Sequence, residues 1–237
     1  YKDTYFMVAN DIDFDSRFTP SLNIFKGKIY GNKYTFRNVI LDAHLSLGST
    51  TRHVSGAGSD YVYGMPGYNV TSSRFGLINT VYAEAFITSI KFESLKMIAS
   101  INNDTEISDN AFVGLFAYNT GRIDNIEILS SDTDDTLISS IIVESNTNLT
   151  SSHNKYVGYL GSIVGYNYGI VSNSINYANV EYNIDPASAG KSIYTVSGLV
   201  GGSSAQIINC INNGDVTIKD NGYTYASNIY HTAQGIT

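Results

Sequence analysis

One pattern appears twice in this chain, as VGLFAYNTGRIDN at residues 113–125 and as GSIVGYNYGIVSN at residues 161–173. A third copy, SGLVGGSSAQIIN, spans residues 197–209, and an earlier one begins at Phe75 with the letters FGLI. Every copy pairs a small residue with two apolar residues. In the three longer copies an asparagine follows that small residue after eleven positions. Such a repeat usually decides the fold, because each copy is one unit of structure.

The copies are unevenly spaced along the chain. Their small residues fall at 76, 114, 162 and 198, which gives intervals of 38, 48 and 36 residues. Each unit reads as two or three short strands, because apolar residues alternate between corners rich in Gly and Asn. A unit of this size cannot bury its own apolar face, whereas stacked units share a continuous core. The sequence therefore predicts an all-β fold, a right-handed parallel β-helix (solenoid) with loop insertions at one corner.

The whole chain, residues 1–237, is predicted to be a single β-helix domain. Within it we expect an N-terminal β segment over residues 1–43, a loop insertion over 44–73 and the repeated coils over 74–237. A further copy begins at Ala226 and stops incomplete, which predicts a fragment of a larger repeat protein. A β-sandwich is the alternative, because the strand spacing alone also fits that fold.

Asparagine has two expected roles at the corners. The asparagines at the fixed position, Asn125, Asn173 and Asn209, predict an internal ladder that satisfies turn backbone groups from coil to coil. The Tyr-Asn-x-Gly corners and the pair Asn213-Gly214 are expected to adopt positive-φ conformations, which Asn and Gly tolerate at low cost.

Composition narrows the possible partners. The chain has 237 residues, of which 15% are charged and 12% are aromatic, and a formal net charge of -7. Its Lys and Arg residues form no cluster, which argues against nucleic acid as a partner. The longest apolar runs, such as residues 137–143, fall far short of the roughly 20 residues that a membrane-spanning helix needs. The single cysteine, Cys210, can form no internal disulfide.

Three acidic residues near the start are a candidate metal site. Asp11, Asp13 and Asp15 alternate, so on one strand they would share a face and could hold Ca²⁺ through oxygen ligands. The solvated face of an edge strand is the alternative reading. The acidic residues at 132, 134 and 135 are interpreted as a solvated loop. No other cofactor is expected.

Catalytic motifs are absent from the sequence. It contains no HExxH, GxSxG or Walker pattern, and its four histidines are scattered. A β-helix polysaccharide lyase or hydrolase would need carboxylates on one face of successive coils. Asp124 and Glu127 are the only nearby acids in the repeated copies. We therefore expect no enzyme activity, with a glycan-cleaving β-helix as the remaining catalytic alternative.

Tyrosines supply the candidate binding residues. Tyr61, Tyr63 and Tyr68 lie close together in the Gly- and Ser-rich insertion, where they could bind a glycan or a protein, since Tyr gives large amphipathic contact area. The alternative is that these rings cap the open end of the core. A second group is expected to lie partly in the core and partly in stacks on a flank of the coils; its members are Tyr156, Tyr159, Tyr166, Tyr168, Tyr177 and Tyr182.

The repeat resembles a known motif. Gly198-Leu199-Val200-Gly201, followed by residues 208–216, is similar to the GLUG repeat of large bacterial surface proteins, and residues 162–180 are similar too. The opening Asn10-Asp11-Ile12-Asp13 resembles the segment that often precedes those repeats. The chain departs from the motif at Ala205, where Gly is usual.

This resemblance implies a function. It implies a non-catalytic bacterial module at the cell surface or outside the cell, an adhesin-like protein that binds a host glycan or a host protein. The alternative that it implies is a substrate-recognition or spacer domain of a large surface metalloprotease of the kind that cleaves immunoglobulin A, with the catalytic part elsewhere.

Overall fold

A computed structural model describes most of the chain. The described residues are 3–17, 19, 21–47, 54–55, 73–103, 111–130, 139–146, 156–184, 192–219 and 232–234. They form 26 strands and no helix. Within these ranges there is accordingly no helix with the length and apolarity needed to cross a bilayer.

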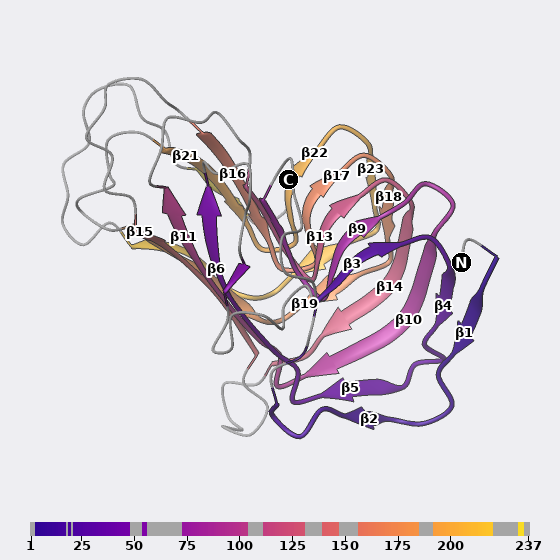
Figure 1. The fold of residues 1–237 in the computed structure, drawn as a ribbon. Helices are drawn as coiled ribbons and strands as arrows, with labels where there is room; N and C mark the ends of the chain where they lie inside the picture. Colours follow the sequence, from indigo (N-terminus) through magenta and orange to yellow (C-terminus); the bar gives the residue numbers. More distant parts are fainter. Residues whose placement is uncertain are drawn as a thin grey trace.

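The described strands belong to four sheets (Figure 1), which we number in the order in which the repeat that starts at β8 passes through them. Sheet 1 contains β8 (Ser73–Phe75), β12 (Ala111–Val113), β16 (Tyr156–Gly161), β21 (Ser192–Ser197) and β26 (Thr232–Gln234). Sheet 2 contains β3 (Leu22–Phe25), β9 (Ile78–Val81), β13 (Phe116–Asn119), β17 (Val164–Asn167) and β22 (Val200–Ser203).

The two larger sheets complete each repeat. Sheet 3 contains β1 (Tyr5–Met7), β2 (Ile12–Asp13), β4 (Lys28–Tyr30), β5 (Thr35–Arg37), β10 (Phe86–Glu93), β14 (Arg122–Ile128), β18 (Ile170–Ser172), β19 (Ile175–Asn176), β23 (Gln206–Ile208) and β24 (Ile211–Asn212). Sheet 4 contains β6 (Ile40–Leu47), β7 (Val54–Ser55), β11 (Lys96–Asn103), β15 (Ser140–Asn146), β20 (Asn179–Ile184) and β25 (Val216–Lys219).

The chain runs through the sheets in the same order in each repeat. It passes from β8 through β9 and β10 to β11, and the next repeat follows with β12, β13, β14 and β15. Among the described strands all pairs are parallel except β6 with β7. The chain is therefore an all-β protein of parallel strands in stacked sheets. This pairing is compatible with the expected β-helix and differs from the antiparallel sheets of a β-sandwich.

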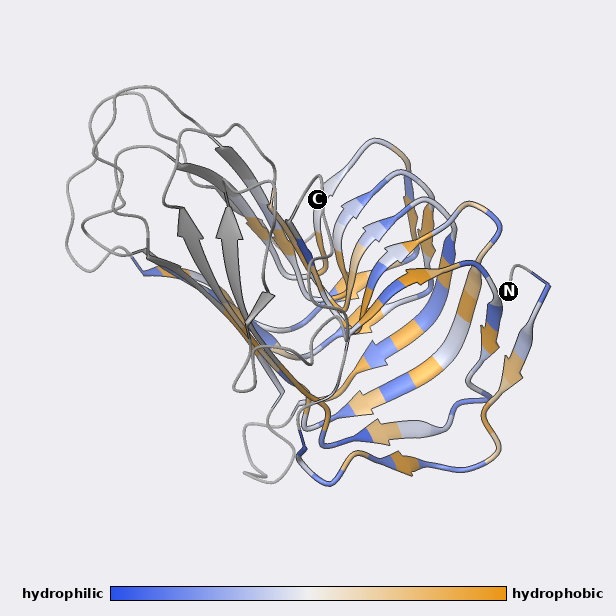
Figure 2. Ribbon diagram, in the orientation of Figure 1, coloured by the Kyte–Doolittle hydropathy of each residue, from blue (hydrophilic) through white to orange (hydrophobic). Residues whose placement is uncertain are grey.

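Equivalent apolar residues of successive repeats lie directly above one another. In sheet 3, Ile87 pairs with Ile123, Ile123 with Val171 and Val171 with Ile207. The first three of these side chains are completely buried. Figure 2 shows apolar and polar residues alternating along the strands of this sheet. The alternation places one apolar face of each strand in the core, as the sequence pattern predicted.

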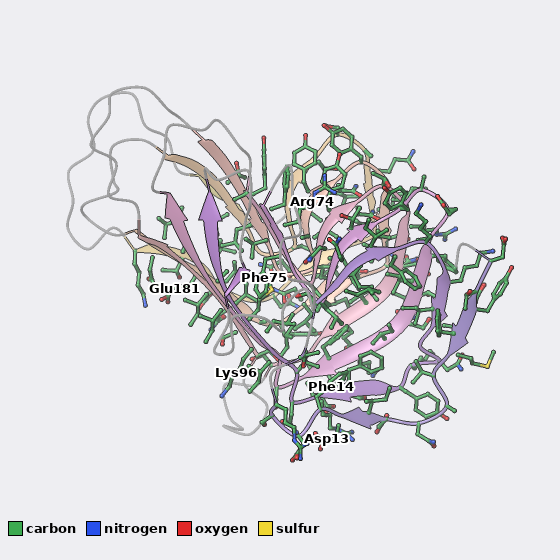
Figure 3. All side chains as sticks on the ribbon, in the orientation of Figure 1. Asp13, Phe14, Arg74, Phe75, Lys96 and Glu181 are labelled. Carbon is green, nitrogen blue, oxygen red and sulfur yellow. The ribbon has the colours of Figure 1, made fainter. Side chains whose placement is uncertain are left out.

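The same alternation is visible in the side chains. Arg74 and Phe75 are neighbours on β8, and Phe75 lies completely buried while Arg74 points to the other face (Figure 3). One tyrosine of the predicted second group, Tyr182, is in the core with 1% of its surface exposed. The expectation that this group lies partly in the core is confirmed.

Buried asparagines connect the repeats at two corners. At the end of sheet 2, the Asn119 amide Nδ2 donates to Asn167 Oδ1 at 2.7 Å, and Asn167 Nδ2 donates to Ser203 Oγ at 3.2 Å. Between sheets 3 and 4, Asn176 Nδ2 donates to Asn212 Oδ1 at 2.8 Å. Since Asn119, Asn167 and Asn176 are completely buried, these bonds form in the interior.

The internal ladder therefore lies at other asparagines than the sequence predicted. Asn125, Asn173 and Asn209 are at outer corners and hold left-handed φ values of 53°, 52° and 54°. Asn209 and Asn173 are exposed, and Asn209 Nδ2 still donates to Asn173 Oδ1 at 2.8 Å. The prediction of an interior position for these three was wrong, while the bond from coil to coil does form here.

The Tyr-Asn-x-Gly corners also differ from expectation. Asn119, Asn167 and Asn213 do not have positive φ values, and neither Gly121 nor Gly169 holds a left-handed φ. A Cβ at Gly121 would collide with the backbone oxygen of Tyr82, and one at Gly169 with the oxygen of Gly121. Glycine is required at these corners because the backbones of successive repeats approach closely.

We expect Asn167→Ala to destabilise the protein by roughly 2–4 kcal/mol. The change removes the acceptor of the Gly169 N–H, the shortest hydrogen bond of the Asn119 amide and the bond to Ser203, and each lost hydrogen bond costs about 0.5–1.5 kcal/mol; the Asn119 amide keeps longer bonds to the Gly121 and Ile170 carbonyls. Urea unfolding followed by circular dichroism measures the loss. The matched control is Asn213→Ala, because Asn213 is exposed and should change stability by less than about 0.5 kcal/mol. Equal stability of the two variants would contradict the ladder.

Candidate functional site

Five aromatic side chains and one arginine gather on the outer faces of sheets 1 and 2. We call this group the aromatic cluster; its members are Arg74, Phe112, Tyr118, Tyr159, Tyr166 and Tyr168. They come from three successive repeats. Phe112 stands between Ala111 and Val113 on β12, and these two neighbours belong to the core. Phe112 therefore points to the opposite, outer face of sheet 1.

Strand register aligns the rings within each sheet. On sheet 1, Phe112 pairs with Tyr159, and their rings stack with 9° between the planes and 5.8 Å between the centroids. On sheet 2, Tyr118 pairs with Tyr166, and their rings lie 6.5 Å apart at 17°. Two parallel rows of rings thus follow from the in-register stacking of the repeats.

Edge-to-face contacts join the two rows. The rings of Tyr159 and Tyr166 lie 4.6 Å apart at 77°, and those of Phe112 and Tyr118 lie 5.4 Å apart at 63°. These are favourable arrangements for aromatic pairs. Gly202, which follows Tyr166 in the register of sheet 2, leaves the space that the rings fill, since a Cβ there would collide with Tyr159 and Tyr166.

Arg74 closes one side of the cluster. Its guanidinium lies 4.0 Å from the centroid of the Tyr118 ring, and its NH1 donates to Thr80 Oγ1 at 2.7 Å. Burial raises the pKa of the Tyr118 phenol, an effect that the charge of Arg74 opposes in part. Burial also raises the pKa of Tyr159. Both phenols therefore remain protonated hydrogen-bond donors well above neutral pH.

Tyr168 is the most exposed ring of the cluster. Its side chain is 53% exposed, whereas Phe112 is 7% exposed. The Tyr168 ring leans on Tyr166 at 4.9 Å and on Tyr118 at 5.5 Å. Its backbone N–H donates to the carbonyl of Asn119 at 2.7 Å, next to the buried asparagine ladder. Tyr168 is thus an exposed aromatic ring on a corner whose backbone is hydrogen-bonded to the preceding repeat.

This arrangement offers an amphipathic binding surface. The rings provide flat apolar contact area, and the hydroxyls provide hydrogen bonds: Tyr166 Oη and Ser204 Oγ lie 2.7 Å apart at the rim. Tyrosine is enriched at binding surfaces because a large contact area costs little conformational entropy to fix. Of the second tyrosine group, Tyr159 and Tyr166 do stack across neighbouring repeats, but on Phe112 and Tyr118, whereas they meet each other edge to face.

Part of the cluster was missing from the sequence prediction. Phe112, Tyr118 and Arg74 were not proposed, although Tyr118 and Tyr166 occupy the same place in the two aligned copies. That alignment was a usable signal for Tyr118. Contacts between sheets, such as Phe112 with Tyr118, depend on how sharply the chain bends after β12, which the sequence does not state.

The predicted metal ligands have separate partners. Asp11 Oδ1 accepts from the Thr35 N–H at 2.9 Å and its Oδ2 lies 3.0 Å from Arg37 NH1. Asp15 lies beyond β2 in a left-handed conformation with φ 56°, and its carboxylate faces Arg17 at 3.1 Å.

Asp13 is held in a third way. Asp13 Oδ1 accepts from Asn38 Nδ2 at 2.9 Å and from the Asp15 N–H at 2.8 Å, and these hydrogen bonds lower the pKa of Asp13. In the part of the chain that the structure describes, no group of three or more His, Cys, Asp or Glu side chains is arranged to hold a metal ion. Ca²⁺ binding at the three aspartates stays a prediction.

Other predicted residues fall elsewhere. Tyr61, Tyr63 and Tyr68 lie outside the described residues, as do the acidic residues at 132, 134 and 135. Glu127, one of the two acids considered for catalysis, forms an ion pair with Lys91 at 3.3 Å on the outer face of sheet 3.

Asp124, the other acid, is the centre of a polar cluster. Its Oδ1 accepts from Ser172 Oγ at 2.6 Å and from Asn173 Nδ2 at 2.8 Å, and its Oδ2 accepts from Thr88 Oγ1 at 3.1 Å. Burial raises the pKa of Asp124, but these hydrogen bonds and the charge of Arg122 outweigh it, so the pKa is lowered. A carboxylate held ionised by donors from the neighbouring repeats stabilises the stack.

Comparisons with known proteins identify no relative. No protein-family model, no curated protein and no solved structure matches this chain.

We expect Asp124→Asn to destabilise the protein by about 1–3 kcal/mol at pH 7, because hydrogen bonds to a charged acceptor are lost across three repeats. The folded-state pKa is lowered, so the ionised form stabilises above the unfolded pKa of about 4, and this contribution disappears as the pH falls through the folded value.

Urea unfolding of the native protein and the variant from pH 7 to pH 3 tests this expectation. The difference in stability should be full at pH 7 and should shrink below about pH 4. Glu84→Gln is the control, because Glu84 is an exposed corner residue and its replacement should have little effect at any pH. A difference that persists unchanged at pH 3 would contradict the role of the charge.

Proposed function

We propose that this chain is a non-catalytic binding module of a secreted or cell-surface bacterial protein, built as a right-handed parallel β-helix and binding a host glycan or protein. The parallel strands and the fixed order of the four sheets support the scaffold. The similarity of residues 198–201 and 208–216 to the GLUG repeat supports the bacterial surface location. Similarity to a repeat motif does not by itself establish a function, so the binding role needs support from the residues of the site.

The observation that carries the proposal is the exposed ring of Tyr168 on top of packed aromatic side chains. Four of the five rings in the aromatic cluster are half-buried or buried, and two of them, Tyr118 and Tyr166, contact the fifth. A ring held in this way loses little freedom when it binds a ligand, so the contact is favourable. The low charged fraction of the chain, 15%, favours a ligand recognised by stacking and hydrogen bonds.

The proposal is tested by screening the purified chain against arrays of glycans and of extracellular-matrix proteins. We expect Tyr168→Ala to lose up to about ten-fold in affinity for the ligand found, since an aromatic contact contributes up to about 1.5 kcal/mol. Tyr177→Ala is the matched control, because Tyr177 is 37% exposed and lies at the corner between sheets 3 and 4, away from the cluster.

A third variant separates the two candidate surfaces. Deletion of residues 56–68 removes Tyr61, Tyr63 and Tyr68 and leaves the aromatic cluster intact. Binding that survives this deletion and fails in Tyr168→Ala would support the aromatic cluster. Binding that is lost only with the deletion would move the site to the tyrosines of the insertion. A chain that binds nothing on either array would contradict the binding role.

A further inference from the structure

One row of corner residues runs along the stack where sheet 2 ends. In successive repeats the N–H of each corner residue donates to a carbonyl of the repeat before it: Tyr82 to Phe25, Thr120 to Val81, Tyr168 to Asn119 and Ser204 to Asn167. The identical bonding makes Tyr82, Thr120, Tyr168 and Ser204 equivalent positions. Lys26, next to Phe25, is the corresponding residue of the first repeat. We call these five residues the corner row.

The two tyrosines of the corner row are two repeats apart. Neighbouring parallel strands are about 4.8 Å apart, so the backbones at Tyr82 and Tyr168 are separated by about 10 Å along the stack. Both rings meet solvent, with 36% of Tyr82 and 53% of Tyr168 exposed. Thr120 lies between them and Ser204 follows. Figure 1 shows β9, β13, β17 and β22, which lead into these corners, side by side.

We propose that the corner row binds an extended, uncharged polysaccharide whose chain runs along the stack, with alternate sugar rings on Tyr82 and Tyr168. This inference rests on the proposed binding function and names its ligand class. The separation of the two corner backbones corresponds to one disaccharide unit of an extended β-1,4-linked chain, so that every second sugar would meet an aromatic ring and the sugar between them would lie over Thr120.

The chemistry of the row matches that of a sugar chain. A pyranose ring has an apolar face of C–H groups and a rim of hydroxyls, so it needs flat rings with polar groups beside them. The row provides the Thr120 and Ser204 hydroxyls next to the tyrosines; Thr120 Oγ1 donates to the Val81 carbonyl at 3.0 Å, so toward a sugar it is an acceptor. Lys26 Nζ lies 4.4 Å from the centroid of the Tyr82 ring. Tyr166 Oη reaches Ser204 from sheet 2 at 2.7 Å.

An uncharged chain fits better than an acidic glycan or a protein. The row contains a single cation, Lys26, in a protein whose formal net charge is -7, so an acidic chain would be repelled overall. A typical protein interface buries about 800 Å² on each partner around a packed apolar centre. The row instead presents two separate rings in a line, which suits a thin linear ligand.

The scaffold holds the backbones of both corners at fixed spacing. The backbone on either side of Tyr168 is bonded to the earlier repeat and to the Asn167 side chain, which accepts from the Gly169 N–H at 3.1 Å. Tyr82 is fixed by its own N–H bond of 3.0 Å to Phe25 and by Lys26 on its ring face. Since binding does not have to order the corner, little conformational entropy is lost.

The test compares hexamers of different shape by isothermal titration calorimetry with the full chain. The probes are cellohexaose, xylohexaose and chitohexaose as extended β-1,4-linked chains, cellobiose as a short chain, and maltohexaose as a hexamer of the same sugar that curls. We expect at least one extended hexamer to bind at least about ten-fold more tightly than cellobiose or maltohexaose, because only it contacts both tyrosines.

Variants locate the contacts. Tyr82→Ala and Tyr168→Ala should each weaken hexamer binding about ten-fold, and the double variant about a hundred-fold, since the two residues are far enough apart for their effects to add. Tyr177→Ala should bind as the native chain does. Circular dichroism of each variant shows that the fold is kept; all three tyrosines are exposed, so no large destabilisation is expected.

The outcomes distinguish this inference from the proposed function. Hexamer binding that depends on Tyr168 but not on Tyr82, or that is equal for cellobiose, would overturn the extended-chain inference and leave a binding module. The same holds where no hexamer binds but the arrays find a protein or an acidic glycan whose binding needs Tyr168. Failure of the hexamers and of both arrays would overturn the two proposals together.

Discussion

The rest of this structure depends on the hydrogen bonds of the backbone groups that are buried at the corners of the stack. Where the backbone turns between sheets, its N–H and C=O groups face a dry interior, and an unpaired group there costs about as much as several surface contacts supply. Three buried asparagines satisfy such groups: Asn119, Asn167 and Asn176. Each side chain accepts a hydrogen bond from an N–H of its own turn and donates one to the equivalent side chain of the next repeat. This double use fixes the register of the repeats.

Fixed register in the interior determines what happens on the outside. Because successive repeats pair residue with residue, any two equivalent outward positions lie one strand spacing apart. Aromatic residues at such positions must therefore stack, as Phe112 does with Tyr159 and Tyr118 with Tyr166. The aromatic cluster is thus a consequence of the buried ladder as much as of its own ring contacts.

The repeat in the sequence was enough to predict parallel, stacked strands, because apolar residues at equivalent positions of successive copies have to share one core. The side of the corner on which each asparagine lies was not predictable. Asn119 and Asn125 are both repeated and both polar, but Asn119 ends β13 and is completely buried, whereas Asn125 bends β14 with a left-handed φ of 53°. The positive φ expected at the corner of Gly121 was wrong for a similar reason. Glycine is needed there because the backbone of the neighbouring repeat comes close, and this contact cannot be recognised from the local sequence.

The contrast between inner and outer positions indicates where function can reside. Equivalent inner residues are chemically alike: Ile87, Ile123 and Val171 are all aliphatic and completely buried. Equivalent outer residues at the corner row differ from one repeat to the next, from Tyr82 to Thr120 to Tyr168. The core requires similar residues because each layer packs on the next, while the outer corners carry no such requirement. Chemical variety on a rigid repeated backbone is the property that a binding surface needs, and in the described part of this molecule it is combined with exposed aromatic rings at the corner row.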